Sequence, residues 1–170
     1  YGGQCYLSYA IGGRSANRGA CAQPCRQTYS LIDEDGKILA KNKHLLSLKD
    51  LDRSAHLKNL IDAGVTSFKI EGRLKDLAYV TNITSFYRKK LDGLIENKKI
   101  PKSSSGKTIF DFIPDPNKTF NRGYTDFCLE GKKNKIASLH TPKSLGERIG
   151  TVKKIAGDHF ILEQENDLKN

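Results

Sequence analysis

The most regular segment of the sequence lies between Lys75 and Glu96, and its pattern predicts an amphipathic helix. Apolar side chains recur there at three- and four-residue spacing: Leu77, Val80, Ile83, Tyr87, Leu91 and Leu94. This spacing aligns them on one face of an α-helix. Such a helix has to bury its apolar face, so the pattern constrains the chain to a layered fold. We expect the second layer to be a sheet.

The residues before this helix predict another helix and a strand. Ser47 and Asp50 have the spacing of a capping box, and the apolar residues after them end at Gly64, which predicts a helix over 47–64. The run from Val65 to Ile70 contains β-branched and aromatic residues and predicts a strand. A helix, a strand and a helix in succession indicate an α/β unit, in which ligands bind where strands end.

Shorter patterns suggest how the rest of the chain is organised. Residues 1–26 show no periodicity and predict an irregular loop, and an Asp-Gly turn predicts a hairpin over 28–39. Residues 98–107 are rich in Lys, Ser and Pro, which is typical of a linker. Strand-like runs at 110–113, 150–155 and 159–162 predict a small antiparallel β unit. We therefore expect an α/β to α+β chain, with an α/β segment at 1–97, a linker at 98–107 and an incomplete β subdomain at 108–170.

The charge of the chain favours anionic partners without selecting one. Its 29 Lys and Arg residues outnumber 19 Asp and Glu residues, which gives a net charge of +10. An RNA-binding surface explains this excess, and so does a lysine-rich proteome. Basic residues gather around the predicted linker, where they suit either phosphate contacts or a solvated helix end: Arg88, Lys89, Lys90, Lys98, Lys99, Lys102 and Lys107.

The sequence shows no sign of a membrane protein. It contains no apolar run of about 18 residues, and its first thirty residues lack the apolar centre of a signal peptide. We expect a cytoplasmic protein with no membrane partner. The chain starts at Tyr1 and contains no methionine, so we expect it to be an internal part of a longer protein.

Three cysteines close together indicate a metal site. Cys5 precedes Cys21 and Cys25, which form a Cys-x-x-x-Cys pair in a Gly-rich segment. Thiolates suit zinc or an iron-sulfur cluster, and the spacing does not choose between them. A disulfide is the structural alternative, but it would leave one thiol unpaired in a cytoplasmic protein. We interpret the distant Cys128 as an ordinary buried thiol.

Charged side chains accompany the cysteines and the predicted strand. Arg14, Arg18 and Arg26 alternate with the cysteines, where guanidinium groups can hold a carboxylate or a phosphate, or simply remain solvated. Strand alternation directs Lys69 and Glu71 to the same face. They are either functional groups at the mouth of the fold or a buried ion pair that only stabilises it.

Several runs of the sequence match the pattern of one known family. The runs are Gly3-Gln4-Cys5-Tyr6-Leu7-Ser8, residues 13–26, Asn42, Leu48-Lys49-Asp50-Leu51, Ala63-Gly64-Val65, Ser67-Phe68-Lys69-Ile70-Glu71-Gly72-Arg73, Tyr79, Phe120-Asn121-Arg122-Gly123-Tyr124 and Pro142-Lys143-Ser144-Leu145-Gly146. In these residues the chain resembles the collagenase-like peptidase family of bacterial enzymes, most densely over residues 1–90.

The resemblance implies a fold and a set of site residues. The family fold looks like a TIM-type barrel followed by a β domain, so we expect residues 1–97 to be a C-terminal remnant of that barrel. The family's first cysteine falls before Tyr1, and three others match this chain, so the piece alone need not retain a cluster. The candidate residues are Cys5, Cys21 and Cys25 for metal, Lys69, Glu71 and Arg73 for catalysis, and Arg14, Asn17, Arg18, Arg26 and Tyr79 for substrate.

Two activities attach to the family. One branch resembles iron-sulfur-dependent hydroxylation enzymes that act on a tRNA uridine or an rRNA cytidine, and another is named for collagenase-like peptidases. The chain contains no HExxH or GxSxG motif, and its histidines lie in no recognisable nucleophile signature. We therefore favour RNA hydroxylation, with a peptidase as the alternative and with the chain alone inactive. Exposed apolar faces would also favour a homo-oligomer.

Overall fold

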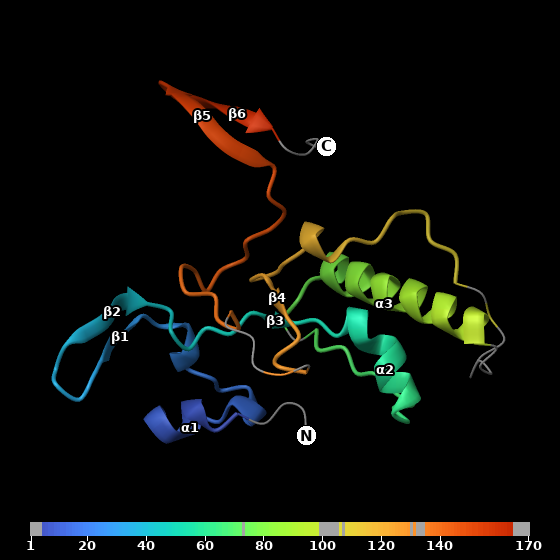
Figure 1. Ribbon diagram of the computed structural model, residues 1–170, viewed down its shortest axis with the longest axis horizontal. Coiled ribbons are helices and arrows are strands. Elements are labelled where there is room, and N and C mark those ends of the chain that lie inside the picture. The colour runs from blue at the N-terminus through green and yellow to red at the C-terminus, as the bar shows by residue number, and fades with distance from the viewer. Residues whose placement is uncertain are drawn as a thin grey trace. The chain divides into compact units, whose positions relative to one another are not determined.

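The computed structural model describes residues 5–72, 74–98, 106, 108–129, 131 and 135–164 (Figure 1). The chain divides into two units, one made of Tyr1–Arg53 and Asn121–Ser144 and the other of Ser54–Phe120 and Leu145–Asn170. Each unit thus contains residues from both sides of the predicted linker, most of which lies outside the described residues. The division predicted at 98–107 stays a prediction.

The first unit begins with short helical elements. Helix α1 (Leu7–Gly12) is followed by the 3-10 turns η1 (Ala16–Arg18) and η2 (Pro24–Arg26). Gly13 ends α1 at a φ of 67°, and its N–H donates to the Tyr9 carbonyl at 2.8 Å. The prediction of an irregular loop was therefore wrong at 7–12, because a left-handed glycine closes a helix too short to show periodicity.

A hairpin follows and confirms the predicted one. Strands β1 (Tyr29–Ile32) and β2 (Ile38–Lys43) pair antiparallel. The Asp33 carboxylate accepts the Lys37 N–H at 2.8 Å, and Gly36 takes a φ of 80°. Asp and Gly therefore act in the turn as the sequence indicates, by accepting a local N–H and by adopting a positive φ.

The helix predicted to start at Ser47 was wrong at its beginning. Asp50–Leu51 forms strand β3, which pairs in parallel with β4 (Tyr124–Thr125). Leu48 forms an isolated bridge to Ala137. These long-range partners bind the backbone that a helix would have used, so tertiary contacts override the capping pattern.

The helix itself begins later, in the second unit. Residues Ser54–His56 form the turn η3, and α2 spans Leu57–Asp62. Gly64, at a φ of 92°, lies just beyond its end, where the sequence predicted the helix to stop. Leu57, only 1% exposed, is the most buried apolar side chain among the described residues of the chain.

Helix α3 (Leu77–Lys98) confirms the helix predicted between Lys75 and Glu96. Its apolar stripe is only partly buried, because Ile83 is 6% exposed whereas Leu77 is 81% exposed. The predicted strand at 65–70 does not form among the described residues, since no neighbouring strand pairs with it there. The expected sheet layer beside α3 is therefore not formed by this segment.

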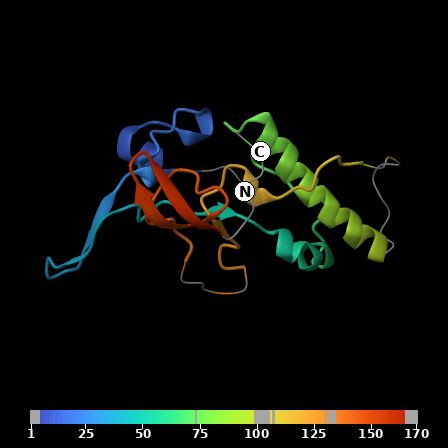
Figure 2. The same cartoon turned by 90° about the horizontal axis from the view of Figure 1, so that it is seen from above.

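Residues 108–118 run back along α3 and end in the turn η4 (Pro116–Lys118) (Figures 1 and 2). The strand predicted at 110–113 was wrong, since this segment is irregular. Asn82 of α3 holds it: its Oδ1 accepts the Asp115 N–H at 2.8 Å, and its Nδ2 donates to the Asp115 carbonyl at 2.6 Å. The segment is thus held by hydrogen bonds from the Asn82 side chain, which we call the Asn82 clamp, and not by pairing with another strand.

The last element is the hairpin of β5 (Gly150–Ala156) and β6 (His159–Gln164), which confirms the strands predicted there. Gly157, at a φ of 62°, supplies the positive φ of its turn. The described strands form three two-stranded sheets, β1-β2, β3-β4 and β5-β6. A barrel remnant stays a prediction.

Replacing Asn82 by Ala should destabilise the second unit by about 1–3 kcal/mol, because the Asp115 N–H and carbonyl lose their partner in a part-buried place. Urea unfolding followed by circular dichroism measures this change. Asn97→Ala is the matched control, since Asn97 is an exposed residue of the same helix and its removal should change stability by less than about 0.5 kcal/mol. Equal effects from both variants would contradict the clamp.

Candidate thiol-arginine site

The turn η2 presents the Cys21–Cys25 segment of the first unit. Pro24 is buried at the start of the turn, and its carbonyl accepts the Tyr29 hydroxyl at 2.7 Å. The Cys21 sulfur accepts the backbone N–H of Gln23 at 3.2 Å. Local backbone groups therefore fix both the turn and the position of one thiol.

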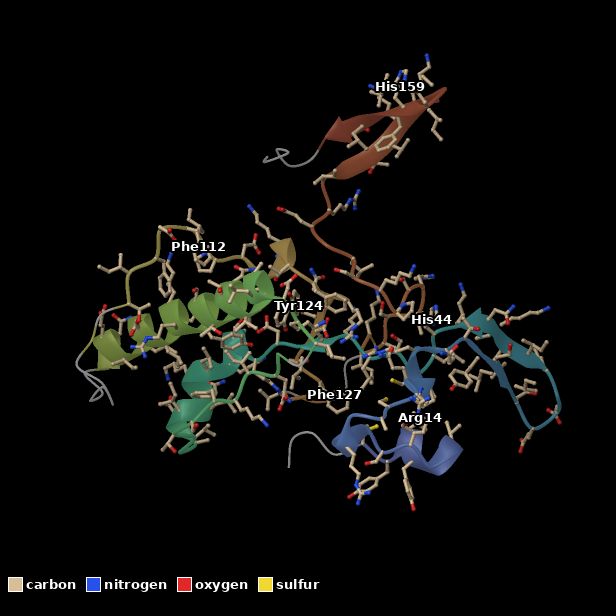
Figure 3. The ribbon with its side chains drawn as sticks, turned by 180° about the vertical axis from the view of Figure 1, so that it is seen from behind. Arg14, His44, Phe112, Tyr124, Phe127 and His159 are labelled. Atoms are coloured by element: carbon tan, nitrogen blue, oxygen red, sulfur yellow. The ribbon has the colours of Figure 1, made fainter. Side chains whose placement is uncertain are left out.

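Helix α1 is held against this segment. Ser8 is 1% exposed, and its hydroxyl accepts the Ala22 N–H at 2.9 Å. Cys5 lies just before the helix and is exposed. Yellow sulfur atoms lie beside α1 and η2 in Figure 3. The sequence predicted these cysteines to share one segment, and Ser8, which the sequence analysis did not single out, joins the two ends of that segment.

Arg26 joins η2 to the chain around Ser47. Its Nη1 donates to the Ser47 hydroxyl at 2.8 Å and to the Leu48 carbonyl at 3.0 Å. Ser47 is fully buried. The Arg26 carbonyl in turn lies 3.0 Å from Nδ1 of His44, and because a carbonyl can only accept, that nitrogen carries the proton (Figure 3). Arg26 is thus held at both its backbone and its side chain.

Opposing charges surround the Arg26 guanidinium. Burial and the nearby Arg122 guanidinium lower its pKa from the ordinary value. The side chains of Cys25, Asp50 and Cys21 act in the opposite direction. Arg26 remains a cation at neutral pH, since arginine does not lose its proton in proteins. The Arg26 guanidinium therefore lies within electrostatic reach of a second guanidinium, a carboxylate and two thiols.

Asp50 and Arg122 form a part-buried ion pair next to this site. The two side chains are 21% and 18% exposed. The Asp50 carboxylate also accepts the backbone N–H of Arg122 at 2.8 Å. Gly123 accepts the Asp50 N–H at 2.9 Å, which continues the β3-β4 pairing. One carboxylate thus anchors the Asn121–Tyr124 segment to the residues that follow Ser47.

The other predicted arginines are more loosely held. Arg14 is exposed, and its Nε donates to the Ala20 carbonyl at 2.9 Å, which closes the loop between α1 and η2 (Figure 3). Arg18 is exposed in η1. The backbone of Asn17 lies in the same turn, and its side chain is outside the described part. Of the predicted substrate-binding arginines, the structure brings only Arg26 into contact with a buried group.

The predicted catalytic residues belong to the second unit. Lys69 and Glu71 form an ion pair at 2.9 Å with side chains 79% and 61% exposed. They lie on the same side of the chain as predicted, but the alternative of a buried ion pair was wrong for this chain, because both side chains are exposed and the described strands form no sheet with this segment. Tyr79 lies in α3, where its ring faces the Lys75 ammonium at 5.4 Å. Arg73 lies outside the described residues.

Sequence reasoning missed Ser47, Asp50 and His44 as parts of the site. Ser47 and Asp50 were assigned to a helix cap, and their true partners, Arg26 and Arg122, are 21 and 72 positions away. No local pattern signals such contacts. The only available hint was that both Leu48-Lys49-Asp50-Leu51 and Asn121-Arg122-Gly123-Tyr124 match the same family.

The donor chemistry of the cysteine segment suits a thiolate-bound group. None of the four cysteines forms a disulfide in the part of the chain that the structure describes. A backbone N–H donating to a cysteine sulfur, as at Cys21, is a contact that tunes thiolate ligands. In the part of the chain that the structure describes, no group of three or more His, Cys, Asp or Glu residues is arranged to hold a metal ion.

The family was then established by comparison. The model of peptidase family U32 matches residues 1–138, so the chain belongs to that family, as its sequence motifs predict. The chain is 49% identical over its whole length to the 23S rRNA 5-hydroxycytidine C2501 synthase of Escherichia coli K12, of which it covers 26%. No solved structure matches the chain significantly.

Two other relatives carry names of two different kinds. The tRNA hydroxylation protein P1 of Bacillus subtilis is 30% identical over 99% of the chain, which covers 42% of it. A collagenase of Porphyromonas gingivalis is 36% identical over 77% of the chain, which covers 35% of it. The chain therefore spans well under half of these relatives. No helix in the described part of the chain is long and apolar enough to cross a membrane.

Replacing Asp50 by Asn should destabilise the first unit by about 1.5–3 kcal/mol, because the part-buried Arg122 guanidinium loses a charged hydrogen-bond partner. Urea unfolding of the protein measures this loss. Asp35→Asn, at an exposed position of the β1-β2 turn, is the matched control and should have little effect. The ion pair is unimportant if both variants unfold at the same urea concentration as the parent.

Proposed function

We propose that the whole protein of which this chain forms a part is an RNA hydroxylation enzyme. The observation that carries this proposal is the 49% identity, over the entire chain, to an enzyme named as a 5-hydroxycytidine synthase of 23S rRNA. The lower identity, 30%, to a tRNA hydroxylation protein favours an rRNA cytidine over a tRNA uridine as the target. An RNA substrate also favours a cytoplasmic location, and the net charge of +10 suits it.

The thiols give the chain its part in this activity. Cys5, Cys21 and Cys25 would supply three ligands of an iron-sulfur cluster, with zinc as the alternative metal, and the fourth ligand would come from elsewhere in the whole protein. A bound cluster supplies electron transfer. The Gln23 N–H would stabilise charge on the Cys21 sulfur, and the Arg26 cation would offset negative charge around the ligands.

The remaining predicted residues have roles that follow from their exposure. Arg14 and Arg18 are exposed beside the cysteine segment, where they would contact phosphates of the RNA. Lys69 and Glu71 form an exposed ion pair, which leaves both free to exchange partners with a substrate. We further propose that the whole protein contains a TIM-type barrel, with Arg73 and Tyr79 near its mouth. Copies of the protein would also associate with one another.

The cysteines are tested by single serine variants of the whole protein. Cys5→Ser, Cys21→Ser and Cys25→Ser should each abolish the brown colour of anaerobically purified protein, its bound iron and sulfide, and hydroxylation of RNA in cells. Cys128→Ser is the control and should change none of these. Iron and sulfide analysis and mass spectrometry of RNA make the measurements. Normal hydroxylation in a strain carrying only the Cys21→Ser protein would overturn the ligand assignment.

The collagenase among the relatives supports a peptidase as the second candidate. His44, which is near Arg26, directs its Nδ1 to the backbone carbonyls of Arg26 and Gln27 and not to a thiol, so it does not act as the base of a cysteine nucleophile. We expect the purified whole protein to leave casein and denatured collagen intact in a gel assay. Cleavage that survives repurification and disappears in the Glu71→Gln variant would favour the peptidase.

A further inference from the structure

Residues 108–119 pass beside α3 in the second unit (Figures 1 and 3). Side chains of this segment and of the helix line two hollows, which together form a groove along α3. One open hollow of about 760 Å³ lies near the start of α3, and a second of about 380 Å³ lies further along it. Thr81 lines both hollows, so they adjoin on one face of the helix. The larger hollow falls within the volume range of ligand sites in proteins.

The groove is lined by aliphatic side chains (Leu77, Ala78, Val80 and Ile113), by the Asn82 amide and by three further kinds of side chain. Two are aromatic, Phe110 and Phe112, and two are cationic, Lys118 and Arg88. Hydroxyl groups come from both walls: Thr81, Thr84, Ser85, Thr108 and Thr119. Among the described residues that line the two hollows, none is acidic.

The aromatic rings are placed so that a planar group can reach them. Their centroids are 6.3 Å apart and their planes are inclined by 75°, so they meet edge to face and do not cover each other. Phe112 is 38% exposed, and the neighbouring Ile113 is 83% exposed. A flat, partly apolar ligand would remove this surface from water.

The charges of the groove favour an anionic ligand. Lys118 is exposed at one end, on η4. Arg88, at the other end, donates to Asp92 at 3.0 Å, so Lys118 supplies the net positive charge. Asn82 clamps the wall that carries both Phe112 and Lys118 through its hydrogen bonds to Asp115, so the groove is formed before a ligand binds.

We propose that this groove binds a single-stranded segment of RNA, with a base stacked on Phe112 and a phosphate at Lys118. Aromatic platforms beside a positively charged groove are the means by which proteins bind single strands, and hydroxyl groups can bond the 2′-hydroxyl and the phosphates. A peptide would use the apolar surface but not the charge pattern. This inference rests on the proposed function and assigns it a contact surface outside the thiol-arginine site.

The test measures binding of a fluorescein-labelled oligouridylate of about twelve nucleotides to the whole protein by fluorescence anisotropy. Phe112→Leu should weaken binding about tenfold or more, whereas Phe112→Tyr should bind as the parent does, because only the former loses the stacking ring. Lys118→Gln should weaken binding and reduce the slope of log K against log salt by about one. The matched controls are Phe160→Leu and Lys37→Gln, both exposed outside the groove.

The outcomes separate the groove from the proposed function. If the parent protein binds the RNA and modifies it in cells but Phe112→Leu and Lys118→Gln bind normally, the groove assignment is overturned and the function stands. If the parent neither binds nor modifies RNA, both proposals are overturned. A Phe112→Leu protein that melts at a lower temperature with unchanged RNA affinity shows that the groove is filled by the protein itself. A Phe112→Leu protein that binds denatured collagen more weakly than the parent, with unchanged RNA affinity, shows that the groove binds peptides. Either result overturns the RNA proposal.

Discussion

The ion pair between Asp50 and Arg122 is the contact on which the first unit depends most. It joins segments 72 positions apart, and the carboxylate receives both the guanidinium and the backbone N–H of Arg122. The β3-β4 pairing that it accompanies involves only two residues on each strand, which is too short to persist alone. Because both charges are largely removed from water, each needs the other to offset its lost hydration. The β3-β4 pairing and the ion pair therefore stabilise each other.

The same contact determines the electrostatics of the thiol segment. Arg122 lies close enough to Arg26 to lower its pKa, so two cations share this part of the unit with one carboxylate. Arg26 tolerates that repulsion because the Ser47 hydroxyl and the Leu48 carbonyl accept its Nη1 donors. The excess of positive charge is a favourable environment for anionic groups. The charges around Arg26 thus come partly from its neighbour Cys25 and partly from Asp50 and Arg122, which are distant in the sequence.

The elements predicted from the sequence are those stabilised by local interactions. The β1-β2 hairpin follows from Asp33 and Gly36 in its turn, and α3 follows from an apolar period within one helix. The capping pattern at Ser47 failed, because its hydroxyl accepts from Arg26, which no spacing rule reveals. The strand runs at 65–70 and 110–113 failed for a related reason: a strand requires a neighbour, and propensity alone does not supply one. For the site, the sequence identified the cysteines and Arg26 but not the residues that hold them.

The described part of the chain is held in shape largely by buried polar groups. Leu57 and Ile83 are buried there together with three prolines, Pro24, Pro114 and Pro116, whereas six polar residues are buried: Ser8, Ser47, Asn82, Ser85, Asn121 and Ser138. Ser8 and Ser47 hold the thiol segment, and Asn82 holds the wall of the groove along α3. Hydrogen bonds are directional, whereas apolar burial is not. Segments fixed by hydrogen bonds therefore keep a defined geometry without having to bury much apolar surface. The thiols and the groove, which need defined positions and open access, therefore lie where polar contacts, rather than a large core, determine the structure.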